Sequence, residues 1–400
     1  MKSLLIKVIC VLIVLGAILI SIPTRQKNDG NEVVFWTLQM NDFAPYMNKV
    51  IKEFEVQNPE IKIKWVDVPF SEGEKRTLSA MLSSNPPDLI NLNPDFSALL
   101  AQKGALAEID RSQLKDFNDE IVDSLSYNGK IYAIPWYATS AITFYNKNLL
   151  QSNSLPKTYK DLIKIKKMNA YVFMPAISEN DTMLKILNKY GISSYADINS
   201  EKSVKVFKMF KDMYNSGLIP KESVTQTHRE ALEKYMSGQI IFFQAGANFL
   251  NMVKENSPLI YEQTQVMPQL IGDLGQYDFS LMNFVIPYKS KHQKEALSFA
   301  LYLTNEKNQL ELAKMTNVIA TNKKALNDKF YKEKGKDLMS QARVISALQL
   351  NNVNPVLKQQ RNQKEINLLV NTAVQNILIN NADIQKTLDE TAQKWKEIIQ

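Results

Sequence analysis

Strand-like and helix-like stretches alternate in the first quarter of the chain, and this alternation is the strongest constraint on the fold. Residues 33–36 (VVFW) are β-branched and aromatic, as in a strand, and apolar residues at helical spacing follow them up to Asn58-Pro59. Residues 61–65 (IKIKW) alternate apolar residues with lysine, and a second helical pattern then ends at Pro86-Pro87, before a third strand at 88–92. Strands joined by helices form a parallel sheet through right-handed crossovers. The sequence therefore predicts an α/β fold.

The alternation continues to about residue 305, and consecutive helices with no clear strand follow it. Further strands are predicted at 130–135, 141–146, 170–174, 239–244 and 281–286. Further helices are predicted at 96–103, 158–167, 181–190, 201–215, 228–237 and 292–304. The last helix, 384–399, places its apolar residues on one face, and we expect it to pack on a lobe. A chain of 400 residues is long enough for two lobes with separate cores.

Residues 1–30 form a targeting segment. Lys2 and Lys7 precede an uncharged apolar run from Val8 to Ile22, which is typical of a secretory signal. With the residues before it, the run approaches the length of a membrane span, and no good small-x-small cleavage site follows it. Both a cleaved signal and a retained membrane anchor therefore remain open. In either case the positive-inside rule places the chain from Gly30 onward outside the cytoplasm.

The composition argues against several classes of protein. Apolar residues make up 45% of the chain and charged residues 22%, which is ordinary for a globular protein. The net charge is +7, but the lysines outside the targeting segment are scattered among acidic residues, so we expect no nucleic-acid partner. The only cysteine, Cys10, lies in the apolar run without the context of a lipoprotein signal, so the exported part cannot form a disulfide within its own chain.

No recognisable catalytic pattern is present. With only His228 and His292 in the chain, we expect no metal site, and no motif for a phosphate-binding loop, a nucleophile elbow or a dinucleotide cofactor occurs. A glycosidase needs only two carboxylates, but no pair of acidic residues stands out. We therefore predict no catalytic residues, no cofactor and no enzymatic activity. An exported oligosaccharide hydrolase stays as a less favoured alternative.

Four stretches at predicted strand ends combine polar groups with aromatic residues. They are residues 36–41 (WTLQMN), 91–96 (NLNPDF), 135–140 (PWYATS) and 244–249 (QAGANF). Ligands of open α/β folds bind beyond the ends of the strands, so these stretches are where a site is expected. Their residue types suit a carbohydrate, because sugar rings pack flat on Trp or Tyr and sugar hydroxyls bond to Asp, Asn and Gln.

Each of these residues also has a structural interpretation. Asp95 can be the N-cap of the following helix, Trp36 can belong to a core, and Asn248 can simply start a helix. Trp65 alternates with Ile61 and Ile63, which favours a core position. The residues alone leave these alternatives open.

The chain resembles the family 1 extracellular solute-binding proteins of bacterial ABC importers, the maltodextrin-binding and related sugar-binding group. The matching segments occur in the same order as in the family and cover most of residues 33–320. They are FWT, VIKEFEVQNPEIKIKWVDVP, NPPDLINLNPDFSALLAQKGALAEID, YNGKIYAIPWYATSAITFYNKNLL, GLIPKES, YMSGQIIFF and VIPYKSKHQKEALSFALYLTNEKNQLELA. Two departures stand out: there is no lipoprotein signal, and Ala247-Asn248 stands where many relatives have an aromatic residue.

This resemblance implies a type II-like periplasmic-binding-protein fold, with two discontinuous lobes, hinge strands and C-terminal helices. Lobe 1 would comprise residues 31–138 plus 287–320, and lobe 2 residues 141–283 plus 325–400. The hinges would lie near 138–143, 283–287 and 320–325. A ligand would be clasped between the lobes.

The resemblance also implies a function. We expect a periplasmic or membrane-anchored monomer that binds a mono- or oligosaccharide by hinge closure and delivers it to the transmembrane permease subunits of an ABC importer. The predicted ligand-binding residues are Trp36, Gln39, Asn41, Asn93, Asp95, Trp136, Tyr137 and Asn248. Alternatives are a polyol or glycerol-phosphate ligand, or a membrane receptor as the partner; a phosphate is less favoured because the four stretches contain neither Arg nor Lys.

Overall fold

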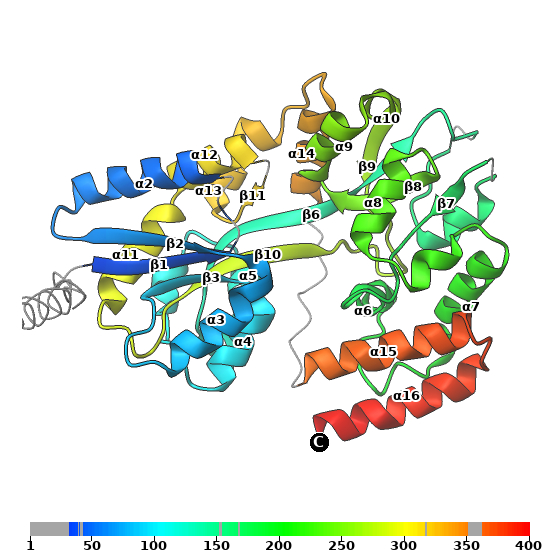
Figure 1. The fold of residues 1–400 in the computed structure, drawn as a ribbon, viewed down its shortest axis with the longest axis horizontal. Coiled ribbons are helices and arrows are strands. Elements are labelled where there is room, and N and C mark those ends of the chain that lie inside the picture. Colours follow the sequence, from blue (N-terminus) through cyan, green and yellow to red (C-terminus); the bar gives the residue numbers. More distant parts are fainter. Residues whose placement is uncertain are drawn as a thin grey trace, which may run out of the picture.

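The computed structural model describes residues 32–38, 40, 43–151, 154–166, 169–316, 318–350 and 362–400. These residues form two lobes that lie side by side and are joined by extended strands (Figure 1). The strands are β1 (Glu32–Leu38), β2 (Lys62–Val68), β3 (Leu89–Leu92), β4 (Ser126–Tyr127), β5 (Lys130–Ile131), β6 (Ile134–Asn146), β7 (Tyr171–Phe173), β8 (Ile240–Gly246), β9 (Thr264–Pro268), β10 (Phe279–Val285) and β11 (Ile319–Ala320).

One mixed sheet runs through both lobes, in the order β2-β1-β3-β10-β6-β8-β7. Strands β1, β2 and β3 are parallel, as their alternation with helices predicts, whereas β10 is antiparallel to β3 and β6. Strands β9 and β11 add to β6 beside this path. The predicted α/β class is therefore confirmed.

Strand β6 belongs to both lobes. Its residues up to Ser140 pair with β10 and β11, and its residues from Ala141 onward pair with β8 and β9. This change of partners separates lobe 1, which contains β1 to β3, from lobe 2, which contains β7 to β9. The sequence predicts two strands here, at 130–135 and 141–146, with a loop between them. That prediction was wrong, because strands hydrogen-bond to the supposed loop at 135–140 and keep it extended.

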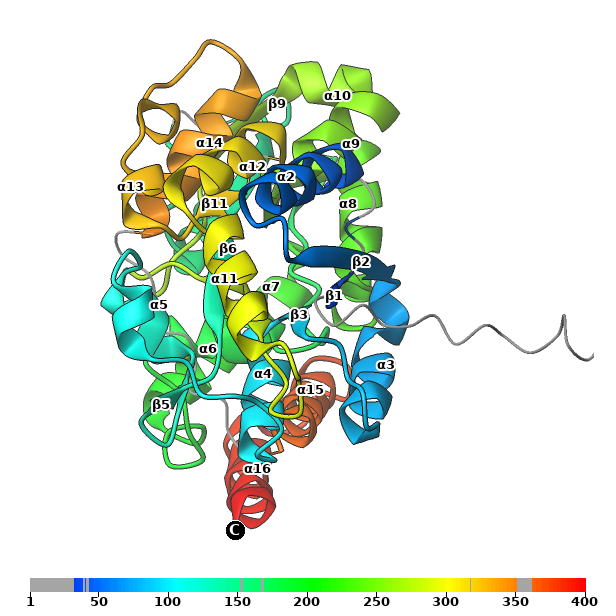
Figure 2. The same cartoon turned by 90° about the vertical axis from the view of Figure 1, so that its left-hand side faces the viewer.

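Helices cover both faces of the lobe 1 sheet (Figure 2). They are α2 (Ala44–Gln57), α3 (Phe70–Leu82), α4 (Pro94–Gln102), α5 (Asp119–Ser124), α11 (Gln293–Leu303), α12 (Glu306–Thr316) and α13 (Lys323–Leu326). On one face Phe35 of the sheet packs with Phe54 and Phe299 of α2 and α11. On the other face Ile90 packs with Phe96 of α4. The parallel strands are therefore buried on both sides, as expected of such a sheet.

Lobe 2 has its own cores and takes up the C-terminal helices. Its helices are α6 (Thr182–Asn188), α7 (Glu201–Asn215), α8 (His228–Met236), α9 (Phe249–Asn256), α10 (Pro258–Gln263), α15 (Gln363–Leu378) and α16 (Ile384–Ile399). Leu388 and Trp395 of α16 are buried with Phe207 and Phe210 of α7, so the apolar face of the last helix packs on a lobe as predicted. Helix α14 (Leu338–Gln349) lies between the lobes and contacts both β6 and β9.

Two local predictions differ from the structure. Residues 158–167 were expected to form an α-helix, but they contain the 3-10 helix η3 (Tyr159–Lys164), whose start is closed by reciprocal bonds between Thr158 and Asp161. The region after residue 305 was expected to have no strand, but β11 pairs there with β6. Two residues are too few for a periodic sequence pattern, so only the pairing with β6 identifies this strand.

Candidate functional site

Predicted site residues of lobe 1 lie in β1 and directly after β3, two strands that pair with each other. Trp36 is half-buried in β1, opposite Val66 of β2 and Ile90 of β3. Asp67 fixes the backbone beyond β1, because its carboxylate accepts hydrogen bonds from the Thr37 hydroxyl at 2.7 Å and from the Met40 amide at 2.9 Å. Gln39 and Asn41 were predicted to bind ligand from this loop, and they lie outside the described residues.

Asn93 and Asp95 stand at the start of α4, directly after β3. The Asn93 side chain accepts a hydrogen bond from the Phe96 amide at 2.8 Å, so Asn93 is the N-cap of this helix. The alternative that Asp95 caps the helix is therefore not realised. Asp95 lies in the first turn with its side chain exposed to solvent, in the position where the helix dipole favours a carboxylate.

Asp95 faces charged residues of the other lobe. Its side chain is exposed to solvent, but nearby protein atoms displace part of the water around the carboxyl group. This desolvation raises the pKa of the carboxyl group. The charge of Asp181, at the start of α6, raises this pKa further, whereas Lys185 on the same helix lowers it. The beginnings of α4 and α6 therefore lie close enough for direct charge–charge interaction between the lobes. We call Asp95, Asp181 and Lys185 the facing charges.

Lys185 is held in place by its neighbour. Its ammonium group lies 3.1 Å from a carboxylate oxygen of Asp181. Burial disfavours the charged form of Lys185, but the charge of Asp181 and the bond to it outweigh this effect, so the pKa of Lys185 is raised. Sequence reasoning missed both residues. The available signal was an acidic and a basic residue four positions apart, at the start of the helix predicted at 181–190.

The loop that leads from β7 to α6 has an unusual backbone. Ala176 has a φ angle of 41° and Asn180 one of 50°, in the left-handed region that residues with a side chain rarely adopt. Asn371 of α15 donates a hydrogen bond at 3.0 Å to the Asn180 carbonyl oxygen and so helps to hold this conformation. Such strain often accompanies ligand contacts. The loop is therefore a candidate wall of the site in lobe 2.

A second strand end lies beside this loop. The amide of His228, at the start of α8, donates a hydrogen bond to Glu179, and its ring bonds to the Gln244 carbonyl oxygen at 2.9 Å. Asn248 follows at the beginning of α9, where its side chain is exposed and caps no backbone amide. The ends of β7 and β8 thus form one cluster in lobe 2, separate from Trp36, Asn93 and Asp95 in lobe 1.

Trp136 occupies a different place from the one its sequence neighbours indicate. It has no exposed surface and stacks on Phe284, with ring centroids 4.5 Å apart. A β-bulge explains this burial, because Met282 pairs with Tyr137 and Asn283 with Pro135, so that Trp136 is the extra residue between them. Its carbonyl oxygen accepts hydrogen bonds from the side chains of Gln309 and Thr321 instead. In this conformation the Trp136 ring offers no surface to a ligand.

Tyr137 is the accessible member of the aromatic pair. Its side chain is half-buried, its ring lies edge-on to Trp136, and its hydroxyl group is 3.9 Å from the sulfur of Met40. Burial raises the pKa of this hydroxyl to about 12. The hydroxyl group is therefore protonated at neutral pH, and in this conformation it donates to the Met40 sulfur.

The described residues show neither a metal site nor a membrane-spanning helix. They contain no group of three or more His, Cys, Asp or Glu side chains placed to hold a metal ion. None of the described helices combines the length and the apolar character that a membrane crossing requires. The apolar run at Val8 to Ile22, predicted to be a signal or an anchor, lies outside the described residues.

Comparison with known proteins assigns the family. The family model for bacterial extracellular solute-binding proteins matches residues 49–339. The chain belongs to this family. Its relatives in the family include binding proteins for sugars, as their names state. The multiple sugar-binding protein of Streptococcus mutans is 24% identical over 311 residues, which are 70% of this chain and 73% of that protein. The galactooligosaccharide-binding protein of Bacillus subtilis is 21% identical over 328 residues, 77% of each chain.

Solved structures of solute-binding proteins have the same two-lobed fold. A putative oligosaccharide periplasmic-binding protein from Synechococcus superposes with a TM-score of 0.82 at 26% identity, over 91% of this chain and 98% of that one. The maltose-binding protein MalE of Listeria monocytogenes, in complex with maltose, superposes with a TM-score of 0.77 at 19% identity, over 92% and 98%. The predicted periplasmic-binding-protein fold is thus confirmed.

Proposed function

We propose that this protein binds a carbohydrate between its two lobes and delivers it to the permease of an ABC importer. The observation that carries the proposal is the position of Asp95, an exposed carboxylate at a strand end of lobe 1 that faces α6 of lobe 2, in a family whose relatives include sugar-binding proteins. A carboxylate accepts hydroxyl hydrogen bonds strongly. A ligand held by both lobes stabilises the closed arrangement through contacts that the open one lacks.

The proposed contacts come from both lobes. Trp36 supplies an aromatic surface, Asn93 and Asp95 supply polar groups beside it, and Tyr137 supplies a hydroxyl donor. Lobe 2 contributes Asn248, to which we add the loop that carries Asp181. Gln39 and Asn41 stay in the proposed site on sequence grounds. Trp136 does not, because it is buried.

We also propose where the chain bends. The change of partners in β6 between Ser140 and Ala141 supports the first hinge at 138–143. For the second hinge we propose residues 278–279 in place of 283–287, because β10 pairs with β3 and β6 in lobe 1 from Phe279 onward. For the third we propose α14 in place of 320–325, because β11 and α13 still pack in lobe 1. Of the described residues, lobe 1 would then comprise those in 32–138 and 279–337, and lobe 2 those in 141–277 and 362–400.

Further parts of the proposal rest on the family and the N-terminal sequence. The protein would work outside the cytoplasm as a monomer and dock on permease subunits. The apolar run at Val8 to Ile22 would be either its export signal or its tether to the outer face of the membrane. It would perform no covalent chemistry on its ligand.

A thermal-shift screen of the full chain tests the ligand class. The arms are mono- and oligosaccharides, polyols, and glycerol phosphates. A ligand of the folded state raises the melting temperature in proportion to the logarithm of its concentration in excess of Kd. We expect a shift with carbohydrates, and recovery of the same sugar unchanged. A shift with glycerol phosphates alone would change the proposed ligand class from a carbohydrate to a glycerol phosphate. We do not expect this shift, because Lys185, the lysine beside Asp95, is already paired with Asp181. Shortened products would indicate a hydrolase.

A further inference from the structure

A fully buried lysine lies where the chain passes between the lobes. Lys189, the residue after α6, has no exposed surface. Its ammonium group lies 2.9 Å from a carboxylate oxygen of Asp278, and it donates hydrogen bonds to the Gln269 side chain at 2.5 Å and to the Leu270 carbonyl at 2.8 Å. All three donors of the ammonium group are thus used. A buried charge is expensive unless it is paired in this way, so the arrangement calls for an explanation.

Gln269 extends these bonds to the crossing of β6. Its side-chain amide donates to the Ala141 carbonyl at 3.2 Å and to the Asp278 carbonyl at 2.9 Å, while its side-chain oxygen accepts from the Asp278 amide at 3.0 Å. Ser140 adds a link, because its hydroxyl donates to the Asp278 carbonyl at 3.2 Å. The Gln269 side chain therefore bonds both to Ala141, where β6 enters lobe 2, and to Asp278, which precedes β10.

Gln349, the last residue of α14, ties in the third segment. Its side-chain amide group donates at 2.8 Å to both the Ser140 hydroxyl and the Ala141 carbonyl. Its side-chain oxygen accepts a hydrogen bond from the backbone amide of Gln269 at 2.7 Å. Lys189, Gln269, Asp278, Gln349 and Ser140 together form what we call the junction network. Each of the three segments that we propose to carry the chain between the lobes has a residue in it.

The backbone around Lys189 is closely packed as well. A Cβ atom at Gly272 would lie 2.6 Å from the Lys189 carbonyl oxygen, so only glycine allows the turn after Leu270 to approach this closely. The Leu274 amide donates to the same carbonyl at 3.0 Å. The network is thus anchored to the body of lobe 2 through both the side chain and the main chain of Lys189.

We propose that the junction network positions the three crossing segments on lobe 2 and so sets the inter-lobe arrangement of the ligand-free protein. Domain closure concentrates its backbone rotation in a few residues at element ends. Residues that the network holds resist that rotation, so the bonds of the network restrain the crossing segments. Lys189, which is buried four residues beyond Lys185 of the facing charges, acts as a positioning residue. The inference rests on the proposed function only where ligand affinity is the readout.

A spin-label distance measurement in the absence of ligand tests this directly. Because Cys10 is the only cysteine, the full chain with Cys10→Ser accepts labels at two chosen sites, Lys103→Cys after α4 and Lys394→Cys in α16, both exposed. The test variant is Lys189→Met with Asp278→Asn, which removes both charges together and leaves neither unpaired. We expect the inter-label distance distribution to shift or broaden relative to the parent protein.

A matched control separates positioning from general loss of stability. Tyr235→Phe removes a buried hydroxyl that bonds to Thr264 at 2.9 Å inside lobe 2 and takes no part in the junction network. We expect it to lower the melting temperature and to leave the distance distribution unchanged. If the double variant does not fold, Gln349→Met decides instead, because it removes the Gln349 bonds to β6 and keeps the ion pair.

Affinity supplies a second readout once the screen has identified a sugar. A change in the population of the binding-competent arrangement should alter the apparent Kd by about fivefold or more. Distance distributions that superpose on that of the parent, in the folded double variant or in Gln349→Met, would overturn the proposal. A failed sugar screen would leave the distance measurement intact, so the two proposals fail separately.

Discussion

Two groups of charged side chains at the junction of the lobes, the junction network and the facing charges, have opposite surroundings. The junction network takes Lys189 completely out of water and gives each of its three donors a protein acceptor. Among the facing charges, Asp95 is exposed to solvent, and it interacts with the charges of Asp181 and Lys185 on the other lobe. A group whose bonding capacity is used up holds structure, whereas a solvated carboxylate can exchange water for a ligand. The difference separates residues that set the geometry from residues that can bind.

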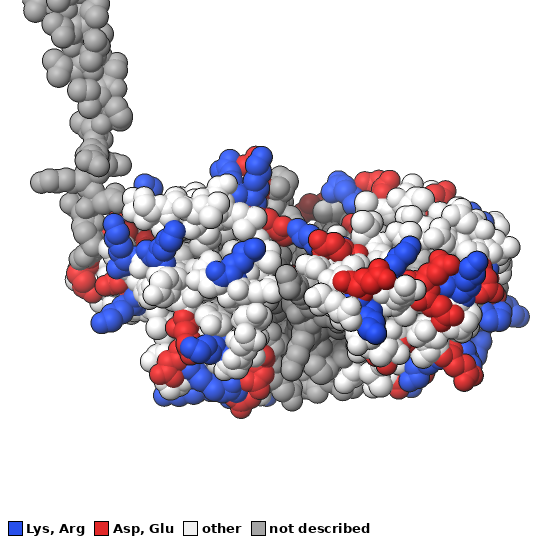
Figure 3. All heavy atoms as spheres, turned by 90° about the horizontal axis from the view of Figure 1, so that it is seen from below, with Lys and Arg blue, Asp and Glu red and all other residues white. Residues whose placement is uncertain are grey.

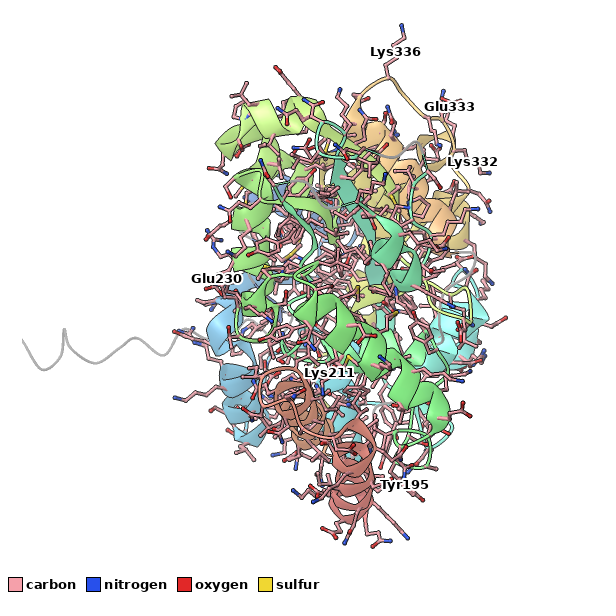
Figure 4. The ribbon with its side chains drawn as sticks, turned by 90° about the vertical axis from the view of Figure 1, so that its right-hand side faces the viewer. Tyr195, Lys211, Glu230, Lys332, Glu333 and Lys336 are labelled. Atoms are coloured by element: carbon pink, nitrogen blue, oxygen red, sulfur yellow. The ribbon has the colours of Figure 1, made fainter. Side chains whose placement is uncertain are left out.

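Most other charged side chains lie on the outer surface of the two lobes. Seen from below, the two lobes carry acidic and basic side chains of both signs, mixed over the visible surface rather than gathered into one patch (Figure 3). From the lobe 2 side, Lys332, Glu333 and Lys336 project into solvent at the far end from α16 (Figure 4). Charges such as these contribute little to stability one by one. The informative charges are those at the junction.

The largest effect is expected from Trp136, the most bulky buried side chain beside the junction. Trp136→Ala should lower the free energy of unfolding by about 3–5 kcal/mol, because it leaves a cavity next to Phe284. Urea denaturation followed by circular dichroism measures the change. Tyr137→Ala, on the half-buried neighbour, is the matched control and should cost clearly less. Equal losses would contradict the difference in burial between the two rings.

Loss of Lys189 alone should come next. Lys189→Met leaves Asp278 in the network without its cation and should cost about 3 kcal/mol, at the lower end for a broken buried pair because Asp278 is 26% exposed. The Lys189→Met and Asp278→Asn double variant should recover part of the loss. Denaturation of the single and double variants completes the cycle. A single variant as stable as the parent would contradict a structural role for the network.

A smaller effect, on binding rather than stability, is expected at the facing charges. Asp95→Asn should weaken carbohydrate binding about tenfold, or ~1.4 kcal/mol, because a neutral amide accepts hydroxyl hydrogen bonds less strongly. The melting temperature without ligand should not fall. Titration calorimetry with the sugar from the screen measures the affinity. Unchanged affinity in the folded variant would remove Asp95 from the site.

The pH dependence should follow the same carboxylate. The pKa of Asp95 is raised above its usual value of 3.8 in the folded protein, so its neutral form persists to higher pH than in the unfolded chain. Any stability that this group adds is therefore present below the usual pKa and is lost as pH rises through the raised one. Ligand binding should move the opposite way and weaken as pH falls through the raised pKa. Asp95→Asn should flatten the binding profile; a profile that it leaves unaltered would assign the titration elsewhere.

The smallest effect is expected at an exposed contact between the lobes. Lys364 of α15 lies 2.6 Å from Glu74 of α3, and the two side chains are 80% and 46% exposed. Lys364→Met should leave the melting temperature unchanged within error, since solvent and salt screen such pairs. A loss comparable with that of Lys189→Met would show that exposed pairs also hold the lobes.

Sequence reasoning performed best where a pattern is local. The strand at 33–36, the parallel strands at 61–65 and 88–92 and the apolar face of the last helix all appear as predicted, because periodicity reports directly which face is buried. The same reasoning could place a helix start near Asn93 and Asp95. Which of the two residues caps the helix depended on the backbone conformation, which the structure supplied. The approach of Asp181 and Lys185 to Asp95 was not predictable, since nearly ninety positions separate the two helices and only the packing of the lobes joins them.

The sequence by itself determined the α/β class, the order of the elements from β1 to β3 and the resemblance to the family. Only the tertiary structure decided the roles of Trp136 and Tyr137. In a regular strand, consecutive side chains point to opposite faces, so one of two adjacent aromatics should face away from the core. The bulge opposite Met282 and Asn283 breaks that alternation and lets both rings pack toward the same core. Its cause is the register of β10, which lies more than 140 positions further along the chain and leaves no trace in the local pattern.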